Sequence, residues 1–218
     1  MKRLLLPALL LGLFGAEVSA QSDRTASCIT STIVGKPLYL SLSTNTLYDL
    51  ALIPNIGAEA WIPGGWSIAT GWHYAWWKVD RNHRYWRTYG GDLQLRRWIG
   101  PRAASKPLTG HHLGIDARML TFDFELGSKG YLADKWTWSA GIEYGYALPI
   151  ARRLNLDFNV TLGYMRGTYK EYLPVDSHYV WQQTRRLSYF GLTSVGIDLV
   201  WLIGHHNTNR TKKKGGGR

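Results

Sequence analysis

The feature that most constrains this chain is a strict alternation of bulky lipophilic residues with small or polar ones. Along residues 66–76 one face carries Trp66, Ile68, Thr70, Trp72, Tyr74 and Trp76, and the other carries Ser67, Ala69, Gly71, His73 and Ala75. Residues 136–148 and 154–164 repeat the pattern. A helix would scatter each set around its circumference, whereas a strand places alternate residues on opposite faces. The pattern therefore predicts an all-β body.

Segments of this kind recur about eight times, and most reach the ~9–11 residues that a tilted strand needs to cross a bilayer. The expected strands are 38–50, 54–62, 65–78, 84–99, 111–124, 135–148, 153–166 and 187–203. The connections 63–65 and 149–153 are short, whereas 125–134 and 167–186, at the opposite end, are long and polar. This arrangement is typical of outer-membrane barrels. We therefore expect residues 37–203 to form an antiparallel transmembrane β-barrel of about eight strands.

Periodicity alone does not say which face points inward, because a lipocalin-like barrel or a sandwich would bury the bulky face. The aromatic residues favour a membrane. The chain has 11 Trp and 13 Tyr against 5 Phe, and these rings gather at strand ends, as Trp61 and Trp66 do beside one turn. Trp and Tyr prefer the interfacial level of a bilayer. We therefore expect the bulky face to point toward lipid.

The two ends of the chain differ from this body. Lys2 and Arg3, an apolar run and a small-residue cleavage site predict a signal peptide over 1–20, followed by a flexible leader over 21–36. Residues 204–218 form a basic tail, expected to be disordered, which carries +5 of the net charge of +11. The charge left on the body is too small to indicate nucleic-acid binding. A single Cys excludes a disulfide framework.

The last expected strand resembles the C-terminal assembly signal of bacterial outer-membrane barrels. In that signal a polar residue, a Gly and two apolar residues recur at fixed spacing, and here they are Ser194, Gly196, Leu199 and Trp201. The resemblance implies recognition by the barrel-assembly machinery. The usual signal ends its chain, whereas residues 204–218 follow it here.

Several segments together resemble a Bacteroidales outer-membrane barrel family that is catalogued as domain of unknown function 3575. The segments that carry the resemblance are 43–49 (STNTLYD), 54–59 (PNIGAE), 74–77 (YAWW), 86–98 (ending in LRRW), 110–114 (GHHLG) and 139–146 (SAGIEYGY). The resemblance covers about 40–203. It implies a β-barrel in the outer membrane of a Gram-negative bacterium and supplies no activity.

Eight strands close around a lumen that side chains can fill. The alternation places a network of charged residues in this lumen: Asp92, Arg96, Asp116, Arg118, Glu143, Asp157 and Asp198. The polar residues Gln94, His112 and Asn159 share that face. Because isolated buried charges are costly, these groups are expected to pair. A paired network favours a blocked core, and a conduit lined by carboxylates is the alternative.

The histidines form no recognisable catalytic or metal-binding arrangement. His73 is expected to be a polar lumen residue, His111 and His112 lie on opposite faces of one strand, and His178 lies in a long loop. We therefore predict no catalytic residue, no metal and no cofactor. Four cations beside one outer loop are candidates for contact with the phosphates of lipopolysaccharide: Lys78, Arg81, Arg84 and Arg87.

These patterns favour a non-enzymatic outer-membrane β-barrel with a structural, docking or surface-interaction role. Its expected partners are outer-membrane lipid, lipopolysaccharide and the barrel-assembly machinery. No nucleic acid is expected, and the sequence identifies no protein partner. A small-solute channel is the first alternative, and a lipid A-modifying enzyme that uses His73 or His178 is the second.

Overall fold

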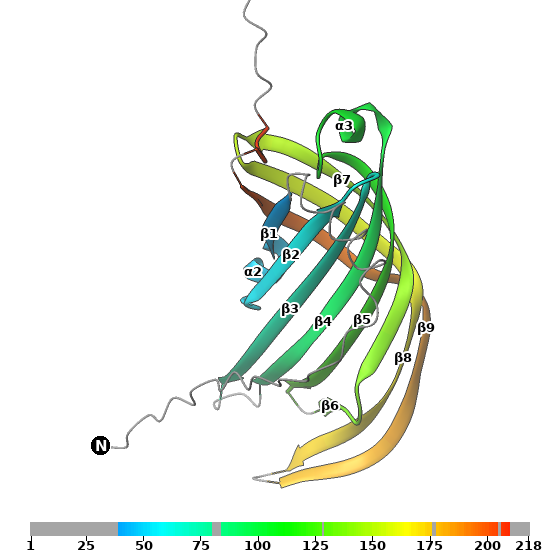
Figure 1. Ribbon diagram of the computed structural model, residues 1–218. Coiled ribbons are helices and arrows are strands. Elements are labelled where there is room, and N and C mark those ends of the chain that lie inside the picture. The colour runs from blue at the N-terminus through cyan, green and yellow to red at the C-terminus, as the bar shows by residue number, and fades with distance from the viewer. Residues whose placement is uncertain (1–38, 80–83, 128, 176–177, 205, 210–218) are drawn as a thin grey trace, which may run out of the picture. The chain divides into compact units, whose positions relative to one another are not determined.

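The computed structural model describes residues 39–79, 84–127, 129–175, 178–204 and 206–209 (Figure 1). The chain divides into two units, Met1–Pro37 and Leu38–Arg218, and all the described residues belong to the second. The expected signal peptide, the leader and the end of the basic tail lie outside the described residues. Among those described, no helix has the length and apolarity to cross a membrane.

Nine strands and two short helices make up the described part of the chain. They are β1 (Leu40–Asn45), α2 (Thr46–Leu50), β2 (Asn55–Ile62), β3 (Trp66–Val79), β4 (Arg84–Ile99), α3 (Gly100–Ser105), β5 (Gly110–Leu126), β6 (Lys129–Ala133), β7 (Thr137–Ala151), β8 (Leu154–Val175) and β9 (His178–Ile203). Eight of the strands form a ring in the order β1-β2-β3-β4-β5-β7-β8-β9. In this ring β9 pairs with β1, and every pairing is antiparallel. The short strand β6 pairs with β5 and β8. The expected antiparallel β-barrel of about eight strands is confirmed.

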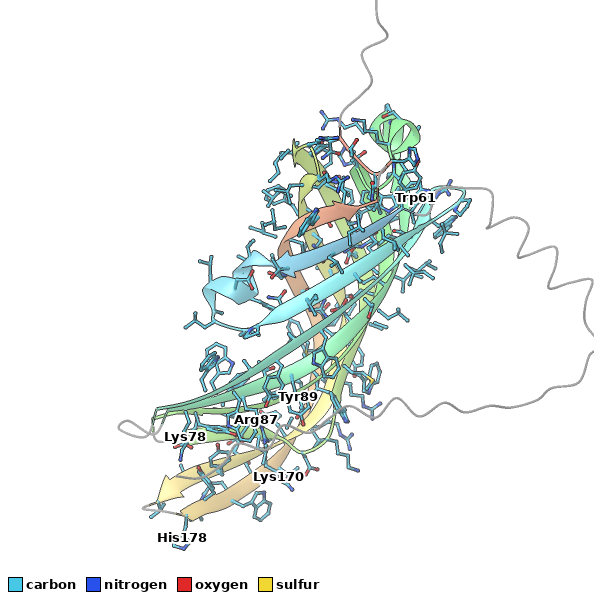
Figure 2. All side chains as sticks on the ribbon, turned by 60° about the vertical axis from the view of Figure 1, so that its left-hand side comes forward. Trp61, Lys78, Arg87, Tyr89, Lys170 and His178 are labelled. Atoms are coloured by element: carbon cyan, nitrogen blue, oxygen red, sulfur yellow. The ribbon has the colours of Figure 1, made fainter. Side chains whose placement is uncertain are left out.

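The two ends of the barrel are distinct. The turn end holds the connections β2–β3, β4–β5 and β7–β8, and in the first of these Gly64 and Gly65 have positive φ angles of 100° and 81°. Such angles favour Gly, because it lacks a Cβ. The loop end holds the other connections. Figure 2 shows Trp61 toward the turn end and Lys78, Arg87 and His178 toward the loop end.

The bulky face of the strands points outward. Ile115 and Ile142 are cross-strand partners and each is 63% exposed, whereas Asp116, next along β5, is 1% exposed. The same alternation holds along β3, where Trp72 is exposed and His73 is buried. An apolar exterior around a polar interior is the reverse of a soluble barrel. The soluble alternative, with its bulky face inward, is therefore wrong.

The first expected strand, 38–50, ends early. After Asn45 the chain forms α2, because the Asn45 side chain accepts hydrogen bonds from the backbone N–H groups of Leu47 (3.0 Å) and Tyr48 (3.3 Å). This is an N-cap, which satisfies donors that a helix start would otherwise leave unpaired. Asp49 accepts a further hydrogen bond from the Thr44 hydroxyl (2.8 Å). The N-cap at Asn45 therefore starts a helix, although the alternating pattern of a strand continues in the sequence to residue 50.

The expected long loop 167–186 is wrong as well. Strands β8 and β9 continue as a paired hairpin to Val175 and from His178, and the expected loop 125–134 contains β6. The residues of this hairpin lack the alternating exposed apolar side chains of the other strands, which we call the apolar belt. We call residues 121–126 of β5, all of β6, 166–175 of β8 and 178–188 of β9 the loop-end extension.

The start of the C-terminal tail is ordered, contrary to the expectation for 204–218. The Asn207 side-chain amide donates to the carbonyl of Leu40 (2.8 Å). The Asn209 amide donates to the carbonyl of Ala151 (2.7 Å) and to the side-chain oxygen of Asn155 (2.7 Å). These bonds hold residues 206–209 against the turn end of the barrel, because side-chain amides can satisfy carbonyls left over at strand ends.

Candidate functional site

Arg96 on β4 lies at the centre of the lumen and bonds to carboxylates from three other strands. Its Nη1 lies 3.1 Å from Oε2 of Glu59 and 3.4 Å from Oδ2 of Asp157, and its Nε lies 2.7 Å from Oε1 of Glu143. All four side chains are buried. A guanidinium suits this position, because its planar array of donors can bind several carboxylates at once.

His112 on β5 joins the same cluster. Its Nε2 lies 2.9 Å from Oδ1 of Asp157, and its Nδ1 lies 3.4 Å from Oε1 of Glu143. The imidazole is fully buried and packs against the indole of Trp98, with 4.7 Å between ring centroids. Both ring nitrogens therefore face carboxylates, and neither faces open space.

Trp98 and Ser67 connect the cluster to a further strand. The Trp98 Nε1–H donates to the Ser67 hydroxyl (2.7 Å), and that hydroxyl donates to Oε1 of Glu59 (2.5 Å). Ser67 is fully buried, and its hydroxyl binds a carboxylate that also holds Arg96. The resulting network, which we call the Arg96 network, consists of Glu59, Ser67, Arg96, Trp98, His112, Glu143 and Asp157.

A second set of polar side chains lines the lumen closer to the loop end. The Gln94 amide donates to Asp92 and Asp116, both at 3.1 Å, and Nη2 of Arg118 lies 3.4 Å from Oδ2 of Asp116. Beside β9, the Asn159 amide donates to Asp198 (2.6 Å).

The structure thus places all seven predicted network charges in the lumen, but it does not join them in one network. Arg96, Glu143 and Asp157 belong to the Arg96 network, and Asp92, Asp116 and Arg118 gather around Gln94. Asp198 lies opposite Asp157 in the strand register and bonds to Asn159. Glu59 was not among the predicted lumen charges, although it shares the inward parity of Asn55 and Gly57. Its signal was a carboxylate on the small-residue face of its strand.

A cavity of about 80 Å³ lies within the lumen. Its wall includes Asn45, His73, Arg118 and Asp198, and it reaches Arg96 of the network. His73 is buried and meets the ring of Tyr48 edge-on, with 5.3 Å between centroids. The cavity is polar and small, so it suits a few water molecules better than an organic substrate.

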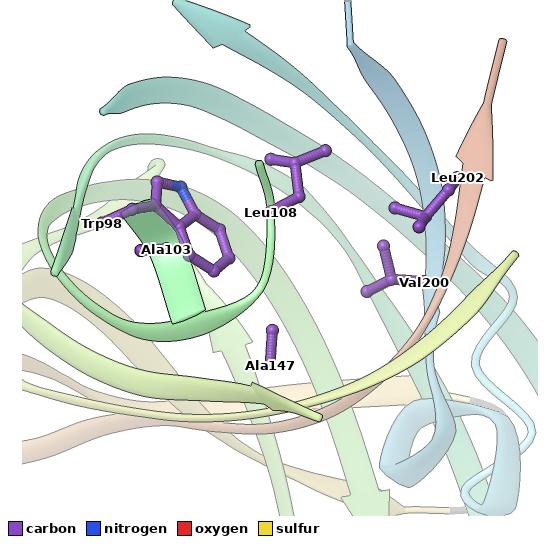
Figure 3. Packing of buried hydrophobic residues seen from close by; sticks show 6 residues of the cluster. All are labelled: Trp98, Ala103, Leu108, Ala147, Val200 and Leu202. Atoms are coloured by element: carbon purple, nitrogen blue, oxygen red, sulfur yellow. The ribbon is translucent and has the colours of Figure 1, made fainter. Parts of the chain in front are cut away.

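An apolar cluster closes the lumen at the turn end. It consists of Trp98, Ala103, Leu108, Ala147, Val200 and Leu202, and Figure 3 shows these side chains facing one another from several strands and the α3 segment. Leu108 and Leu202 are each 1% exposed. The Asn155 amide donates to the carbonyl of Leu108 (2.8 Å) and so ties the end of the connection between β4 and β5 to β8. We call this cluster the plug.

The buried charges of the lumen join several strands. Within the described ranges, no three His, Cys, Asp or Glu side chains are placed to hold a metal ion. Among the residues that the structure describes, no hydrogen bond joins His73 to a carboxylate. His178 is exposed at the start of β9. The buried charges instead tie β2, β4, β5, β7 and β8 together across the barrel.

The predicted lipopolysaccharide contacts are placed only in part. Lys78 is exposed near the loop end of β3, Arg84 begins β4, and Arg81 lies outside the described residues. Arg87 is already engaged on the barrel exterior: its Nη2 lies 3.7 Å from Asp123, and its guanidinium lies 5.9 Å from the centroid of the Trp76 ring.

The predicted assembly signal lies on β9, the strand that closes the ring. Leu199 and Trp201 share the outward parity, and Trp201 is exposed. Gly196 faces the lumen, where a Cβ would collide with the Asn159 amide. Ser194 is half-buried and lies opposite Thr161. The phasing assumed for the signal therefore agrees with the strand, whereas its recognition stays a prediction.

Fold and lumen together define a class: an eight-stranded antiparallel barrel with a lipophilic exterior and a polar, filled interior. The chain belongs to the family described as "Protein of unknown function (DUF3575)", which matches residues 24–203. Among solved structures, the chain is similar to a major outer membrane protein from Thermus thermophilus, with 9% identity and a TM-score of 0.38. That likeness covers 76% of this chain and 98% of the other. No curated protein matches the chain.

Proposed function

We propose that this protein is a non-enzymatic, non-conducting barrel of the outer membrane that holds a docking element at its loop end. The observation that carries the proposal is the double closure of the lumen by the Arg96 network and the plug. The setting is the outer membrane of a Gram-negative bacterium, and the family resemblance implies Bacteroidales. The apolar exterior supports this placement, because exposed Ile, Trp and Leu would be costly in water.

A conducting pore needs a continuous water-filled path. Here Arg96 and His112 span the lumen with buried carboxylates, and Leu108 and Leu202 fill its turn end. Small barrels of eight strands have just enough interior for side chains. Both the polar and the apolar layer would have to move before an ion could pass. The structure therefore favours a closed body over the small-solute channel.

The loop-end extension is the part of the barrel suited to docking. Residues 166–175 of β8 continue for ten residues beyond the apolar belt, or about 30 Å at the usual strand rise. The Tyr172 ring lies over Gly130, and its hydroxyl donates to Asp123 (2.8 Å). This contact fastens β8 to β6 and β5, so the extension is a braced sheet.

A cluster around Glu171 braces the inner face of the extension. The Glu171 carboxylate accepts from the Gln183 amide (2.8 Å), and it lies 3.1 Å from Nε of Arg185 and 3.4 Å from Nζ of Lys129. The hydrogen bond from Gln183, together with the two cations, holds the pKa of the Glu171 carboxyl below its usual value. A braced, charged sheet at the loop end is a suitable surface for lipopolysaccharide or for a protein.

Two measurements test the proposal. Purified protein in planar bilayers should show no steady single-channel current under conditions in which a porin conducts, and a steady current would contradict it. Sidedness is tested in a Cys28→Ser background, since Cys28 is the single cysteine. A membrane-impermeant maleimide should label Tyr179→Cys in whole cells and should label Pro63→Cys, at the turn end, only after lysis. Equal labelling of both would refute the orientation.

A further inference from the structure

The ring is closed along only part of its height. β1 pairs with β9 from Asn45 opposite Asp198 to Leu40 opposite Ile203. β9 itself begins at His178, so its residues 178–197 pair with β8 on one side. On the other side, no strand in the described part of the chain pairs with them. This stretch, which we call the β9 free edge, is twenty residues long.

The opposite wall of the opening is β3. Strand β2 pairs with β3 only as far as Asn55 opposite His73, and β3 runs on to Val79, as Figure 1 shows. The helix α2 lies at the base of the opening, where the Thr46 hydroxyl donates to the carbonyl of Ile197 (2.7 Å). The paired segment of β1 and β9, which we call the seam, ends at Asp198. The Thr46 hydroxyl thus satisfies the first β9 carbonyl beyond the seam, and the free edge starts there.

Part of the β9 free edge lies at the depth of the apolar belt. Phe190 is 80% exposed and Leu192 is 47% exposed, and they pair with the exposed Tyr164 and Leu162 of β8. In an antiparallel strand, every second residue directs its N–H and C=O away from a given neighbour. Hydrocarbon offers no partner for those groups, which is why membrane barrels normally close without an edge.

The sequence of the edge favours pairing. Residues 178–197 contain no Pro, Lys, Asp or Glu, the residues that commonly protect an edge strand from pairing. Aromatic and β-branched residues suit a strand, and here they are Tyr179, Val180, Trp181, Thr184, Tyr189, Phe190, Thr193, Val195 and Ile197. Two cations, Arg185 and Arg186, are exposed on it.

We propose that the β9 free edge is a strand-addition site, and that its occupant is an extended segment of a partner protein. An extended polypeptide supplies donors and acceptors at the spacing of the edge, which acyl chains do not. A second copy inserted the same way up would bring its β9 alongside in parallel, whereas a partner segment can run antiparallel, the slightly more stable pairing. Arg185 already binds Glu171, whereas the exposed Arg186 favours an acidic residue at the outer end of the segment.

This inference deepens the proposed docking role and rests on it. The test places the photo-crosslinker p-benzoylphenylalanine in vivo at Tyr179, Phe190 or Leu192, each a separate variant of the full chain. The matched control is Ile142, which is 63% exposed but lies on β7, a strand paired on both sides. The edge variants should give one polypeptide adduct that the control lacks.

The position of the crosslink distinguishes strand addition from ordinary contact. Moving the crosslinker by two residues, from Phe190 to Leu192, should move the adduct by two residues along one partner segment, as mapped by mass spectrometry. Adducts that do not move, or that equal those at Ile142, would overturn the proposal. So would an adduct with a second copy, a crosslink to residues 21–36 of the same chain, or lipid adducts alone.

The same variants separate this inference from the proposed function. Each is checked for heat-modifiable gel migration and for bilayer current. A folded, non-conducting barrel without a polypeptide adduct would refute strand addition and leave the closed barrel intact. A conducting barrel would refute the proposed function whatever the crosslinker reports.

Discussion

Replacing Arg96 with Met should destabilise the barrel more than any other single change to the lumen. The substitution removes one cation from three buried carboxylates, at 2.7 Å from Glu143, 3.1 Å from Glu59 and 3.4 Å from Asp157. Removing one partner of a buried ion pair costs about 3–5 kcal/mol, because the remaining charge is left uncompensated. Because three carboxylates share Arg96, this range is a lower bound for the loss of unfolding free energy while all three stay ionised. Protonation of some of them would reduce the loss. At 1.4 kcal/mol for each factor of ten, the ratio of folded to unfolded protein falls by roughly 140- to 3,700-fold.

The matched control is Arg97→Met, one residue along. Arg97 points outward, is exposed, and lies 5.3 Å from the centroid of the Trp66 ring. Exposed cation–π contacts and surface ion pairs contribute about 1 kcal/mol or less. Urea titrations in detergent, followed by Trp fluorescence and by heat-modifiable migration, give the free energy of unfolding for both variants.

A third variant checks that the cost is electrostatic. Arg96→Met combined with Glu143→Gln removes one unpaired carboxylate, so it should be more stable than Arg96→Met alone, a non-additive result expected of groups in one network. If Arg96→Met unfolds at the same urea concentration as Arg97→Met, the lumen network contributes no stability and the reasoning is refuted.

Three further changes test other parts of the structure. Leu108→Ala should lower the free energy of unfolding by about 2–5 kcal/mol, the usual range for a buried Leu, without opening a current, because the Arg96 network still fills the lumen; a current would contradict this. Gly130→Ala should make the loop-end extension protease-sensitive while the barrel stays heat-modifiable, because a Cβ there collides with the Tyr172 ring; Tyr172→Phe, which loses only the hydroxyl, is the milder control. Because the pKa of Glu171 is lowered by folding, its contribution is present above about pH 4.5 and is lost as the pH falls below that value. Limited proteolysis should therefore cut the extension increasingly as the pH drops below 4.5, and Glu171→Gln should remove that dependence; an identical pH profile in the variant would count against it.

The strands and faces of this fold can be predicted from local sequence, whereas the pairing of its lumen charges depends on residues far apart in the chain. The alternation along residues 66–76 predicts a strand and its two faces, because side-chain direction in a strand depends only on parity. Parity also places Arg96 in the lumen. Parity likewise places Glu143 and Asp157 there, but it does not predict which carboxylates bind Arg96 and it did not lead to Glu59. Glu59 and Asp157 are 37 and 61 residues away in sequence, and strand register is set by tertiary pairing.

The two wrong segments failed for opposite reasons. In 38–50 the alternation continues, but the short-range hydrogen bonds of the Asn45 cap turn the chain into α2. In 167–186 the alternation is lost, although the backbone pairing of β8 with β9 continues. Apolar periodicity therefore reports the belt of a membrane barrel and not the full length of its strands.

The position of the Arg96 network also explains how a barrel with so short a seam stays closed. Strand β1 contributes six residue pairs with β9 and four with β2, fewer than any other junction of the ring. The network is built beside this seam: Glu59 lies opposite Ser41 of β1, and Asp157 lies opposite Asp198, which pairs with Asn45. Side-chain bonds across the lumen thus supplement the few backbone bonds between β1 and β9. It follows that Arg96→Met should accelerate amide hydrogen exchange in β1 more than in β7, which pairs with β8 from Trp138 to Ala151. Equal acceleration in both strands would mean that the network stabilises the barrel as a whole and not its seam.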